Sequence, residues 1–191
     1  MKKVVFTFGR YNPPTVGHAE LITYAVRYAQ KHGAEHRIYT SQSHDSSKNP
    51  LSAAQKITFL RQIFPGVNFV ADRTAVTAFA ICRKLADEGY DDVTFVVGDD
   101  RVEEMRNSLH SYNGQFDKHG RGYKFDSINV MTRHDQNNMR DASGRDGVHA
   151  SDVRKAAREG DIDLVRQQLH PNLSMGMVRS IVKRIQQRTK K

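Results

Sequence analysis

The residues best suited to chemistry lie at a glycine-rich corner near the start of the chain, in the segment GRYNPPTVGH from Gly9 to His18. An apolar run precedes this corner and a helical pattern follows it, so the pattern predicts strand, turn and helix. At such a corner the backbone N–H groups and the positive helix end point to one spot, which suits a phosphate. Thr15 is a suitable N-cap, and His18 falls in the first helical turn, where its ring reaches the same spot.

Small and rigid residues shape this corner. Because Gly9 carries no Cβ, it permits a ligand to approach the backbone closely. Gly17 lets the new helix lie close under the same spot, and Pro13 and Pro14 fix the path of the loop. An ordinary tight turn with a capping histidine fits the same residues. The corner alone therefore leaves both interpretations open.

A second segment with phosphate-binding chemistry lies far along the chain, at residues 147–154. Ser151 is a good N-cap, and a helical pattern starts directly after it. The cap brings N–H groups, a hydroxyl and the guanidinium of Arg154 near one another, which predicts a second phosphate cradle. An ordinary capped helix is the alternative. We expect the regions near residues 18 and 154 to face a common pocket sized for a triphosphate.

Two further segments carry candidate ligand contacts. The polar loop of residues 41–51 has the composition of a flexible surface loop, but His44 and Lys48 suit a mobile lid that carries cations to a phosphate. Gly98 and Asp99 follow a buried strand, at the end where open α/β sheets place ligands. Asp99 or Asp100 fits a contact to ribose hydroxyls or to a magnesium-bound water, and either fits a cap of the next helix equally well.

The elements that must position these residues alternate between strands and helices. Strands are expected at residues 3–8, 37–40, 67–71, 92–97 and 125–131. Helices are expected at residues 17–31, 52–64, 74–87 and 102–109, then from Ser151, at 161–169 and from 174 to the end. The strands at residues 3–8 and 92–97 are continuously apolar, as in parallel strands covered on both faces. The pattern predicts an α/β fold with a parallel sheet, right-handed crossovers and helices on both faces.

The glycines of residues 111–124 suggest an insertion or hairpin of no assigned role. We divide the chain into a domain of residues 1–157 and a C-terminal helical extension of residues 158–191, packed on that domain. After Met177 the tail holds Lys and Arg but no acid, which is typical of a solvated basic face and also permits a nucleic-acid or partner role.

Composition and charge limit the possible partners. A net charge of +9 over 191 residues implies a negatively charged partner, either a phosphate-rich small molecule or nucleic acid, although a bland basic surface explains it as well. The single cysteine, Cys82, excludes an internal disulfide, fits a reducing cytoplasm and lies in a pattern typical of a buried thiol. No apolar run approaches the roughly 20 residues that span a membrane, so no membrane partner is expected.

Three motifs in this order resemble those of a known enzyme class. Thr15 to His18 resemble the (H/T)-x-G-H signature of the HIGH-type nucleotidyltransferases, and the G-R-x-x-P frame from Gly9 is similar to that of archaeal-type nicotinamide mononucleotide adenylyltransferases. Residues 43–51 resemble the S-H-x-x-x-x-N-P-[FL] segment of the latter family, with Lys56 at the place of a basic residue in the next helix.

The third motif is the second phosphate cradle. Residues 148–154 resemble the family motif I-S-x-T-x-x-R, with His149 in place of the usual serine. Read from Arg145, the stretch also resembles the R-T-x-G-I-S-T-T motif of cytidylyltransferases. The polar segment before Ser151 looks like that of viral members, whose substrates are unassigned.

The resemblance implies a Rossmann-like fold from Lys3 to about Ala157 and direct transfer of a nucleotide, in which an acceptor phosphate attacks the α-phosphorus of a nucleoside triphosphate. It implies that His18 contacts the α-phosphate, Thr15 the β- or α-phosphate, and Arg154 the β- and γ-phosphates. Because Thr15 replaces a histidine of many members, it provides a hydrogen bond without charge. Further nucleotide contacts are implied for Gly9, Arg10, Tyr11, Asn12, Gly17, Lys48, Gly98, Asp99, His149 and Ser151, and acceptor contacts for His44, Asn49 and Arg133.

Adenylyl transfer from ATP to nicotinamide mononucleotide, giving NAD, is the leading specific reaction that the resemblance implies. Mg²⁺ is the expected cofactor, held by the phosphates and water and by no direct protein ligand. CTP with a phosphorylated alcohol, or ATP with another phosphate such as phosphopantetheine, fits the same motifs. A non-catalytic nucleic-acid-binding protein is the alternative of another class. A cytoplasmic location is expected, in the host cytoplasm for a viral protein, and a homo-oligomer is possible.

Overall fold

A five-stranded parallel sheet is at the centre of the fold. The computed structural model describes residues 1–45, 47–135 and 148–189. The strands are β1 (Lys3–Gly9), β2 (Glu35–Thr40), β3 (Phe69–Val70), β4 (Asp92–Val96) and β5 (Ser127–Met131), in the order β3-β2-β1-β4-β5. In the register of β1 with β4, Val4 lies opposite Val93 and Phe6 opposite Phe95. All four side chains are buried, so the continuous apolar pattern does report strands covered on both faces.

The helices follow the predicted alternation. They are α1 (Val16–Lys31), α2 (Ala53–Ile63), α3 (Ala78–Asp87), α4 (Val102–Tyr112), α5 (Ala150–Glu159), α6 (Ile162–Gln168) and α7 (Met175–Thr189), with a 3-10 turn, η1 (Asp99–Arg101), before α4. The prediction of a helix from residue 74 is wrong, because Thr77 caps α3 by accepting the N–H of Ala80 at 3.1 Å. Asp72 instead accepts hydrogen bonds from the N–H and hydroxyl of Thr74 and forms a separate turn.

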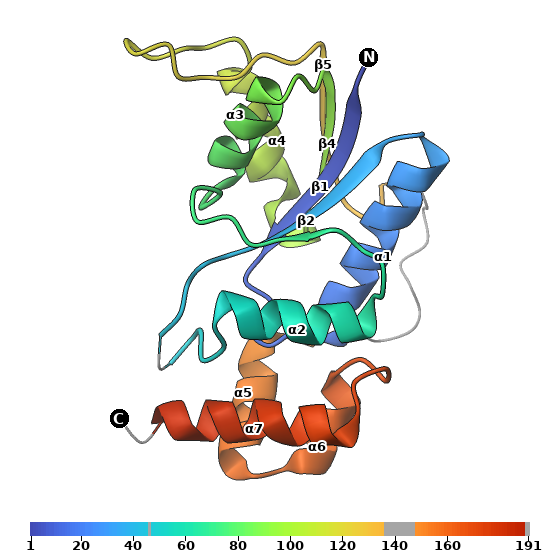
Figure 1. The fold of residues 1–191 in the computed structure, drawn as a ribbon, viewed down its shortest axis with the longest axis vertical. Helices are drawn as coiled ribbons and strands as arrows, with labels where there is room; N and C mark the ends of the chain where they lie inside the picture. The colour runs from blue at the N-terminus through green and yellow to red at the C-terminus, as the bar shows by residue number, and fades with distance from the viewer. Residues whose placement is uncertain (46, 136–147, 190–191) are drawn as a thin grey trace. The chain divides into compact units, whose positions relative to one another are not determined.

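The described residues group into two compact units. The first comprises residues 1–8, 21–39 and 72–135, and the second comprises residues 9–20, 40–45, 47–71 and 148–189. In the first unit α1 lies on one side of β1 and β4, and α3 and α4 lie on the other side (Figure 1). Helices therefore cover both faces of the sheet, as predicted. The predicted domain boundary between residues 157 and 158 stays a prediction.

A hydrophobic core joins α2, α5, α6 and α7 within the second unit. Its buried members are Leu51, Phe59, Ile63, Val153, Ala156, Ala157, Val165, Leu169, Leu173, Val178, Ile181, Val182 and Ile185. On α5 the spacing of Val153, Ala156 and Ala157 places one apolar side against this core. This packing fixes the direction of α5, and so the position of its first turn.

In the first unit, residues 113–123 form the hairpin-like insertion that the glycines suggested. Phe116 pairs with Gly122 in an antiparallel bridge, and Asp117 accepts backbone N–H bonds from His119 and Arg121 inside the turn. Cys82 is completely buried, as its pattern predicted. No helix among the described residues is long and apolar enough to cross a membrane.

Candidate functional site

Thr15 and His18 cap the first turn of α1 reciprocally. The backbone N–H of His18 points to Oγ1 of Thr15 at 3.4 Å, and the backbone N–H of Thr15 donates to Nδ1 of His18 at 3.1 Å. Oγ1 of Thr15 is also 3.0 Å from Nδ1. This is a capping box in which histidine takes the place of the usual glutamate or glutamine. Because Nδ1 accepts hydrogen bonds here, a neutral His18 carries its proton on Nε2.

The ring of Tyr11 supports His18. The two rings are 5.2 Å apart with an interplanar angle of 80°, and Tyr11 is fully buried. Tyr11 has a φ of 44°, an unusual left-handed conformation for a bulky residue. A Cβ on Gly9 would lie 2.7 Å from the Tyr11 ring. The space that we predicted Gly9 would leave for a ligand is therefore filled by this ring.

His18 is a neutral hydrogen-bond donor near neutral pH. Its pKa is lowered from 6.5 to about 4, mainly by burial and in addition by the nearby His149 and Arg10. The site thus holds several cationic groups close enough to repel one another. A polyphosphate would relieve this repulsion, because its negative charge would attract each of the cationic groups.

Asn12 connects the corner to two distant segments of the second unit. Its side-chain amide donates to the carbonyl of Leu51 at 2.8 Å and accepts the N–H of Leu51 at 2.9 Å. Its backbone carbonyl accepts a hydrogen bond from Nη1 of Arg154 at 2.8 Å. The predicted proximity of Arg154 to the glycine-rich corner is therefore present. Burial, Arg158 and Arg10 all lower the pKa of Arg154, which is a second sign of unbalanced positive charge.

His149, and not Ser151, is the N-cap of α5. The backbone N–H of His149 donates to the carboxylate of Asp152 at 3.2 Å, so the helix begins at Ala150. An acid three residues after the cap fixes this start, since it satisfies the N–H of the cap residue. Ser151 occupies the second helical position with an exposed side chain. The prediction of the N-cap is thus wrong by two residues, and the role of Ser151 stays a prediction.

The carboxylate of Asp45 organises the loop after β2. It accepts hydrogen bonds from the backbone N–H groups of Ser47, Lys48 and Asn49, and from the side-chain amide of Asn49. The Asn49 amide and these N–H groups hold the pKa of Asp45 well below its ordinary value. Arg158 of α5 donates to the carbonyl of Ser47 at 2.8 Å. Residues 47–49 are thus bonded to Asp45 and, through Ser47, to α5, and Lys48 is exposed.

Lys56 is a functional candidate that the sequence did not single out beyond its place in the motif. The side chain is fully buried, and Nζ donates to the carbonyl and hydroxyl oxygens of Ser41 at 2.5 and 3.2 Å. The N–H of Ser41 in turn donates to the carbonyl of Gly9 at 2.9 Å. Burial lowers the pKa of Lys56 to about 8. A buried cation therefore lies one residue away from the glycine-rich corner.

Gly98, Asp99 and Arg133 belong to the first unit, and their roles in a ligand site stay predictions. Asp99 caps no helix, because its carboxylate pairs with Nδ1 of His134 at 2.7 Å. A Cβ on Gly98 would lie 2.8 Å from the carboxylate of Asp100. The second unit holds the remaining predicted contacts. These are Gly9, Arg10, Tyr11, Asn12, Thr15, Gly17, His18, His44, Lys48, Asn49, His149, Ser151 and Arg154. Arg145 lies outside the described residues.

The described side chains offer no direct site for a metal ion, since they contain no group of three His, Cys, Asp or Glu residues placed to hold one. The groups gathered at the corner, His18, Arg10 and Arg154, are instead donors and cations. They suit the oxygens of a phosphate chain, and the prediction of Mg²⁺ stays a prediction.

Comparisons with known proteins concern the fold and the family of the chain. Solved structures with the same fold include *Plasmodium falciparum* nicotinic acid mononucleotide adenylyltransferase complexed with NaAD, at 11% identity and a TM-score of 0.62 over 96% of both chains. A *Vibrio parahaemolyticus* protein assigned as a nicotinate-nucleotide adenylyltransferase is 17% identical, with a TM-score of 0.56 over 95% of this chain and 99% of that one.

*Thermotoga maritima* TmcAL bound with alpha-thio ATP is 12% identical, with a TM-score of 0.55 over 96% of this chain and 56% of that one. At these identities the likeness shows the fold alone. No curated protein sequence is significantly similar to the chain. The family model described as cytidylyltransferase-like matches residues 6–156, a span that includes the glycine-rich corner and the first turns of α5. The chain therefore belongs to the cytidylyltransferase-like family of nucleotidyltransferases.

Proposed function

We propose that the protein transfers a nucleoside monophosphate from a nucleoside triphosphate to a phosphate-bearing acceptor. A phosphate oxygen of the acceptor forms a bond to the α-phosphorus, the bond from this phosphorus to the bridging oxygen breaks, and pyrophosphate leaves with the electron pair. Such a transfer needs positioning and charge stabilisation more than a side-chain base, because the attacking phosphate oxygen is already deprotonated. The observation that carries the proposal is the corner itself, where a neutral His18 donor lies among cationic groups and Arg154 bonds to Asn12.

In this proposal each residue acts through hydrogen bonds and charge. Nε2–H of His18 donates to a non-bridging oxygen of the α-phosphate, where negative charge grows in the transition state. Nη1 of Arg154 is engaged by Asn12, which orients the guanidinium so that its other N–H groups are available to the β- and γ-phosphates. Lys48 adds a charge from the loop that Asp45 organises. Mg²⁺, when bound, supplies charge neutralisation to the phosphates, which together with water would hold it.

ATP and nicotinamide mononucleotide are the substrates that we propose, with NAD as the product. The support is the G-R-x-x-P frame, the loop of residues 43–51, and the adenylyltransferases among the structures of the same fold. CTP with a phosphorylated alcohol is the second candidate, because residues 145–152 also resemble the cytidylyltransferase motif.

A substrate screen by pyrophosphate release tests this proposal. ATP and CTP are each paired with nicotinamide mononucleotide, nicotinic acid mononucleotide, glycerol 3-phosphate and phosphopantetheine in the presence of Mg²⁺. We expect release with ATP and nicotinamide mononucleotide that depends on both substrates, and its loss in His18→Asn. The matched control, Lys155→Gln, alters an exposed cation of the same helix as Arg154 and should keep its activity.

A non-catalytic nucleic-acid-binding protein makes the opposite prediction. Such a protein would release no pyrophosphate with any pair and would bind DNA or RNA with an affinity that falls steeply with salt. That pair of results would reject the enzymatic proposal.

A further inference from the structure

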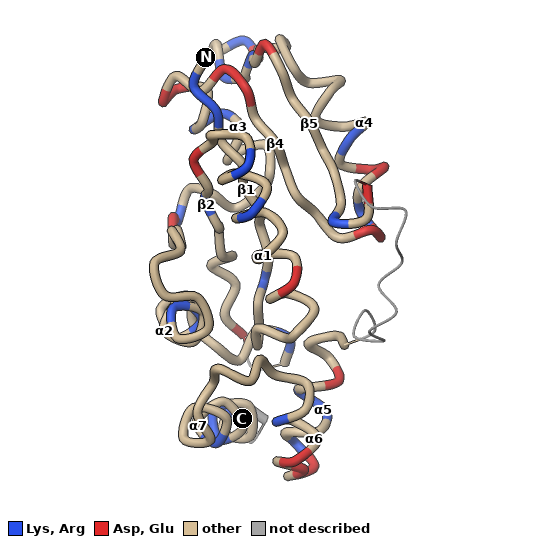
Figure 2. Tube along the Cα trace, turned by 90° about the vertical axis from the view of Figure 1, so that its right-hand side faces the viewer, with Lys and Arg blue, Asp and Glu red and all other residues tan. Residues whose placement is uncertain are grey.

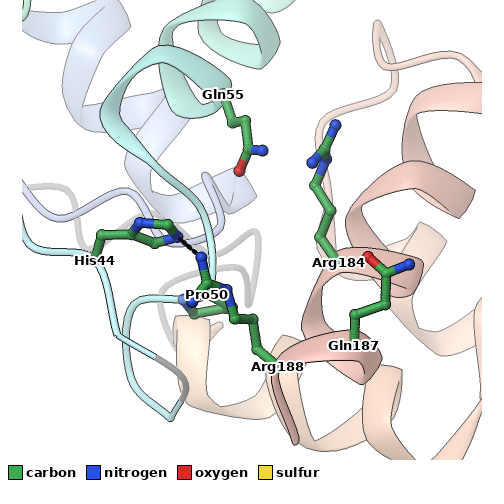
Figure 3. A pocket seen from close by; sticks show the side chains of 6 residues that line it. All are labelled: His44, Pro50, Gln55, Arg184, Gln187 and Arg188. Carbon is green, nitrogen blue, oxygen red and sulfur yellow. Dashed lines mark hydrogen bonds between the residues drawn. The ribbon is translucent and has the colours of Figure 1, made fainter. Parts of the chain in front are cut away.

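A small pocket of about 170 Å³ lies within the second unit, where the loop after β2 and the first turn of α2 meet the last turns of α7. Its lining residues are His44, Pro50, Gln55, Arg184, Gln187 and Arg188 (Figure 3). None of these six is an acid, and two of them are arginines. The volume is below the roughly 300 Å³ at which pockets for complete small molecules begin, so it suits a compact anionic group.

Arg184 lines this pocket and is partly buried. Its Nε is buried and has no hydrogen-bond partner among the described residues. A buried donor without a partner is unfavourable, so a hydrogen-bond acceptor from outside would be favoured. Oε1 of Gln55 accepts the N–H of Ser52 at 3.0 Å, which leaves the amide NH₂ of Gln55 as its available donor. Figure 3 shows this amide nitrogen on the side that faces Arg184.

Arg188 is held in place by a hydrogen bond to His44. Its Nη2 donates to Nε2 of His44 at 2.8 Å, so the imidazole is the acceptor in this contact. The guanidinium is therefore positioned without its charge being balanced. Helix α7 itself offers no counter-charge, because residues 175–189 contain Arg and Lys but no Asp or Glu (Figure 2). An anion in the pocket would meet two guanidinium groups one helical turn apart.

We propose that this pocket binds a phosphate-type oxyanion, either inorganic phosphate or the head group of a phosphomonoester. Guanidinium groups match the oxygens of phosphate through paired N–H donors, and the Gln55 amide adds a donor from a second element. The anion would tie His44, and with it the loop that carries Lys48, to α7. This is a second anion site, and its existence does not depend on the catalytic proposal above.

Titration with inorganic phosphate, at an ionic strength kept constant with sodium chloride, tests the site. The readouts are isothermal calorimetry and the ¹⁵N–¹H signals of the arginine Nε groups. We expect Arg184→Gln and Arg188→Gln each to weaken phosphate binding at least tenfold. The matched control is Arg179→Gln, which removes the same charge from an exposed position on the same helix and should change affinity less than twofold. Circular dichroism and thermal unfolding verify that each variant folds, which is expected because glutamine is a good helix former.

Two further arms identify the ligand and the site. If ribose 5-phosphate binds with the same affinity as phosphate, the pocket recognises the oxyanion alone. If ribose 5-phosphate binds more tightly and Arg184→Gln removes this binding, the ligand is a phosphomonoester. Phosphate binding that Arg154→Gln abolishes but Arg184→Gln leaves intact would place the anion at the candidate active site and overturn the proposal. Equal weakening by Arg179→Gln, or binding of single-stranded RNA with none of phosphate, would overturn it as well.

Discussion

The backbone N–H of Thr15 and the Nδ1 atom of His18 lie 3.1 Å apart, within the capping box at the first turn of α1. One nitrogen of the histidine therefore stabilises the helix, and the other is left with the proton. These two roles can be separated by mutation, because the carboxamide oxygen of an asparagine can replace Nδ1 as acceptor and no atom of asparagine reaches the place of Nε2.

We expect His18→Asn to retain the fold and lose catalysis. Loss of one donor to transition-state charge costs about 10²–10³ in turnover, measured by pyrophosphate release with saturating substrates. His18→Ala should lose turnover to the same extent and also lose about 1 kcal/mol of stability in urea unfolding, because the cap is broken. A His18→Asn protein with normal turnover would show that the ring only caps the helix.

The low pKa of His18 predicts two effects of pH. His18 is neutral above pH 5, so the pH profile of kcat/KM should show no step near pH 6.5 that is due to His18. Any step near pH 6.5 should remain in His18→Asn. Stability should also depend on this group. Because the pKa is about 4 when folded and 6.5 when unfolded, the unfolded chain takes up the proton first as the pH falls.

The stabilisation is thus complete above pH 6.5 and is lost between pH 6.5 and 4, by at most about 3 kcal/mol. Urea unfolding of the wild type at pH 7 and pH 4.5 measures the loss, and His18→Asn should show a smaller one. Equal losses in the two proteins would contradict the lowered pKa.

The residue pattern was sufficient to predict the sheet and the corner, but not the contacts around the corner. Continuous apolar runs identify β1 and β4 as strands covered on both faces. The alternation of strands and helices located the other strands, and each strand was found to within two residues. The N-cap of α5 was missed because serine is the commoner cap, whereas here the acid at Asp152 decides where the helix begins.

Contacts between segments distant in the sequence have no local signal. The ring of Tyr11 over Gly9 results from an unusual backbone conformation, which no pattern reports for a tyrosine. The burial of Lys56 depends on how α2 packs after β2, and a lysine in a helical pattern is normally exposed. A sign of its environment was present only in the motif that places a basic residue after the loop.

Arg154 should contribute to triphosphate binding through its charge and its planar shape. We expect Arg154→Gln to raise the KM for the triphosphate about tenfold or more, since a charge-assisted hydrogen bond contributes about 1.5–3 kcal/mol. Arg154→Lys should recover only part of this, because lysine cannot bond to Asn12 and a phosphate in the same fork geometry. Lys155→Gln, which changes the charge of the next residue, is the control and should leave KM within about twofold. Equal effects of Lys155→Gln and Arg154→Gln would indicate a general loss of positive charge.

Cys82 should be inert in the folded protein. Burial raises the pKa of its thiol to about 12, so almost no thiolate is present at pH 8. We expect the thiol to react with a disulfide reagent at least a hundredfold more slowly in buffer than in 6 M guanidinium chloride, where the chain is unfolded. Rapid labelling of the folded protein at pH 8 would show that the helix that carries Cys82 opens readily.

The buried amine of Lys56 gives the strongest test of the interior around the corner. Its pKa is about 8 when folded and 10.5 when unfolded, so at pH 7 the protein bears the cost of a buried charge. The unfolded chain binds the proton more tightly between these values, and stability from this group is present above pH 10.5 and lost as the pH falls to 8.

Lys56→Met removes this dependence, together with the hydrogen bonds to Ser41. The free energy of unfolding of the variant minus that of the wild type should therefore be larger at pH 7 than at pH 10, by up to about 3 kcal/mol. Only the part of the lost Ser41 contacts that does not depend on pH cancels in this comparison, and the rest is contained in the pKa shift of Lys56. Lys84→Met, at a partly exposed lysine that pairs with Asp72, should show no such trend in favour of the variant at pH 7. If the difference in the free energy of unfolding between Lys56→Met and the wild type does not change with pH, the pKa of Lys56 is not lowered. The amine would then be hydrated in the folded protein.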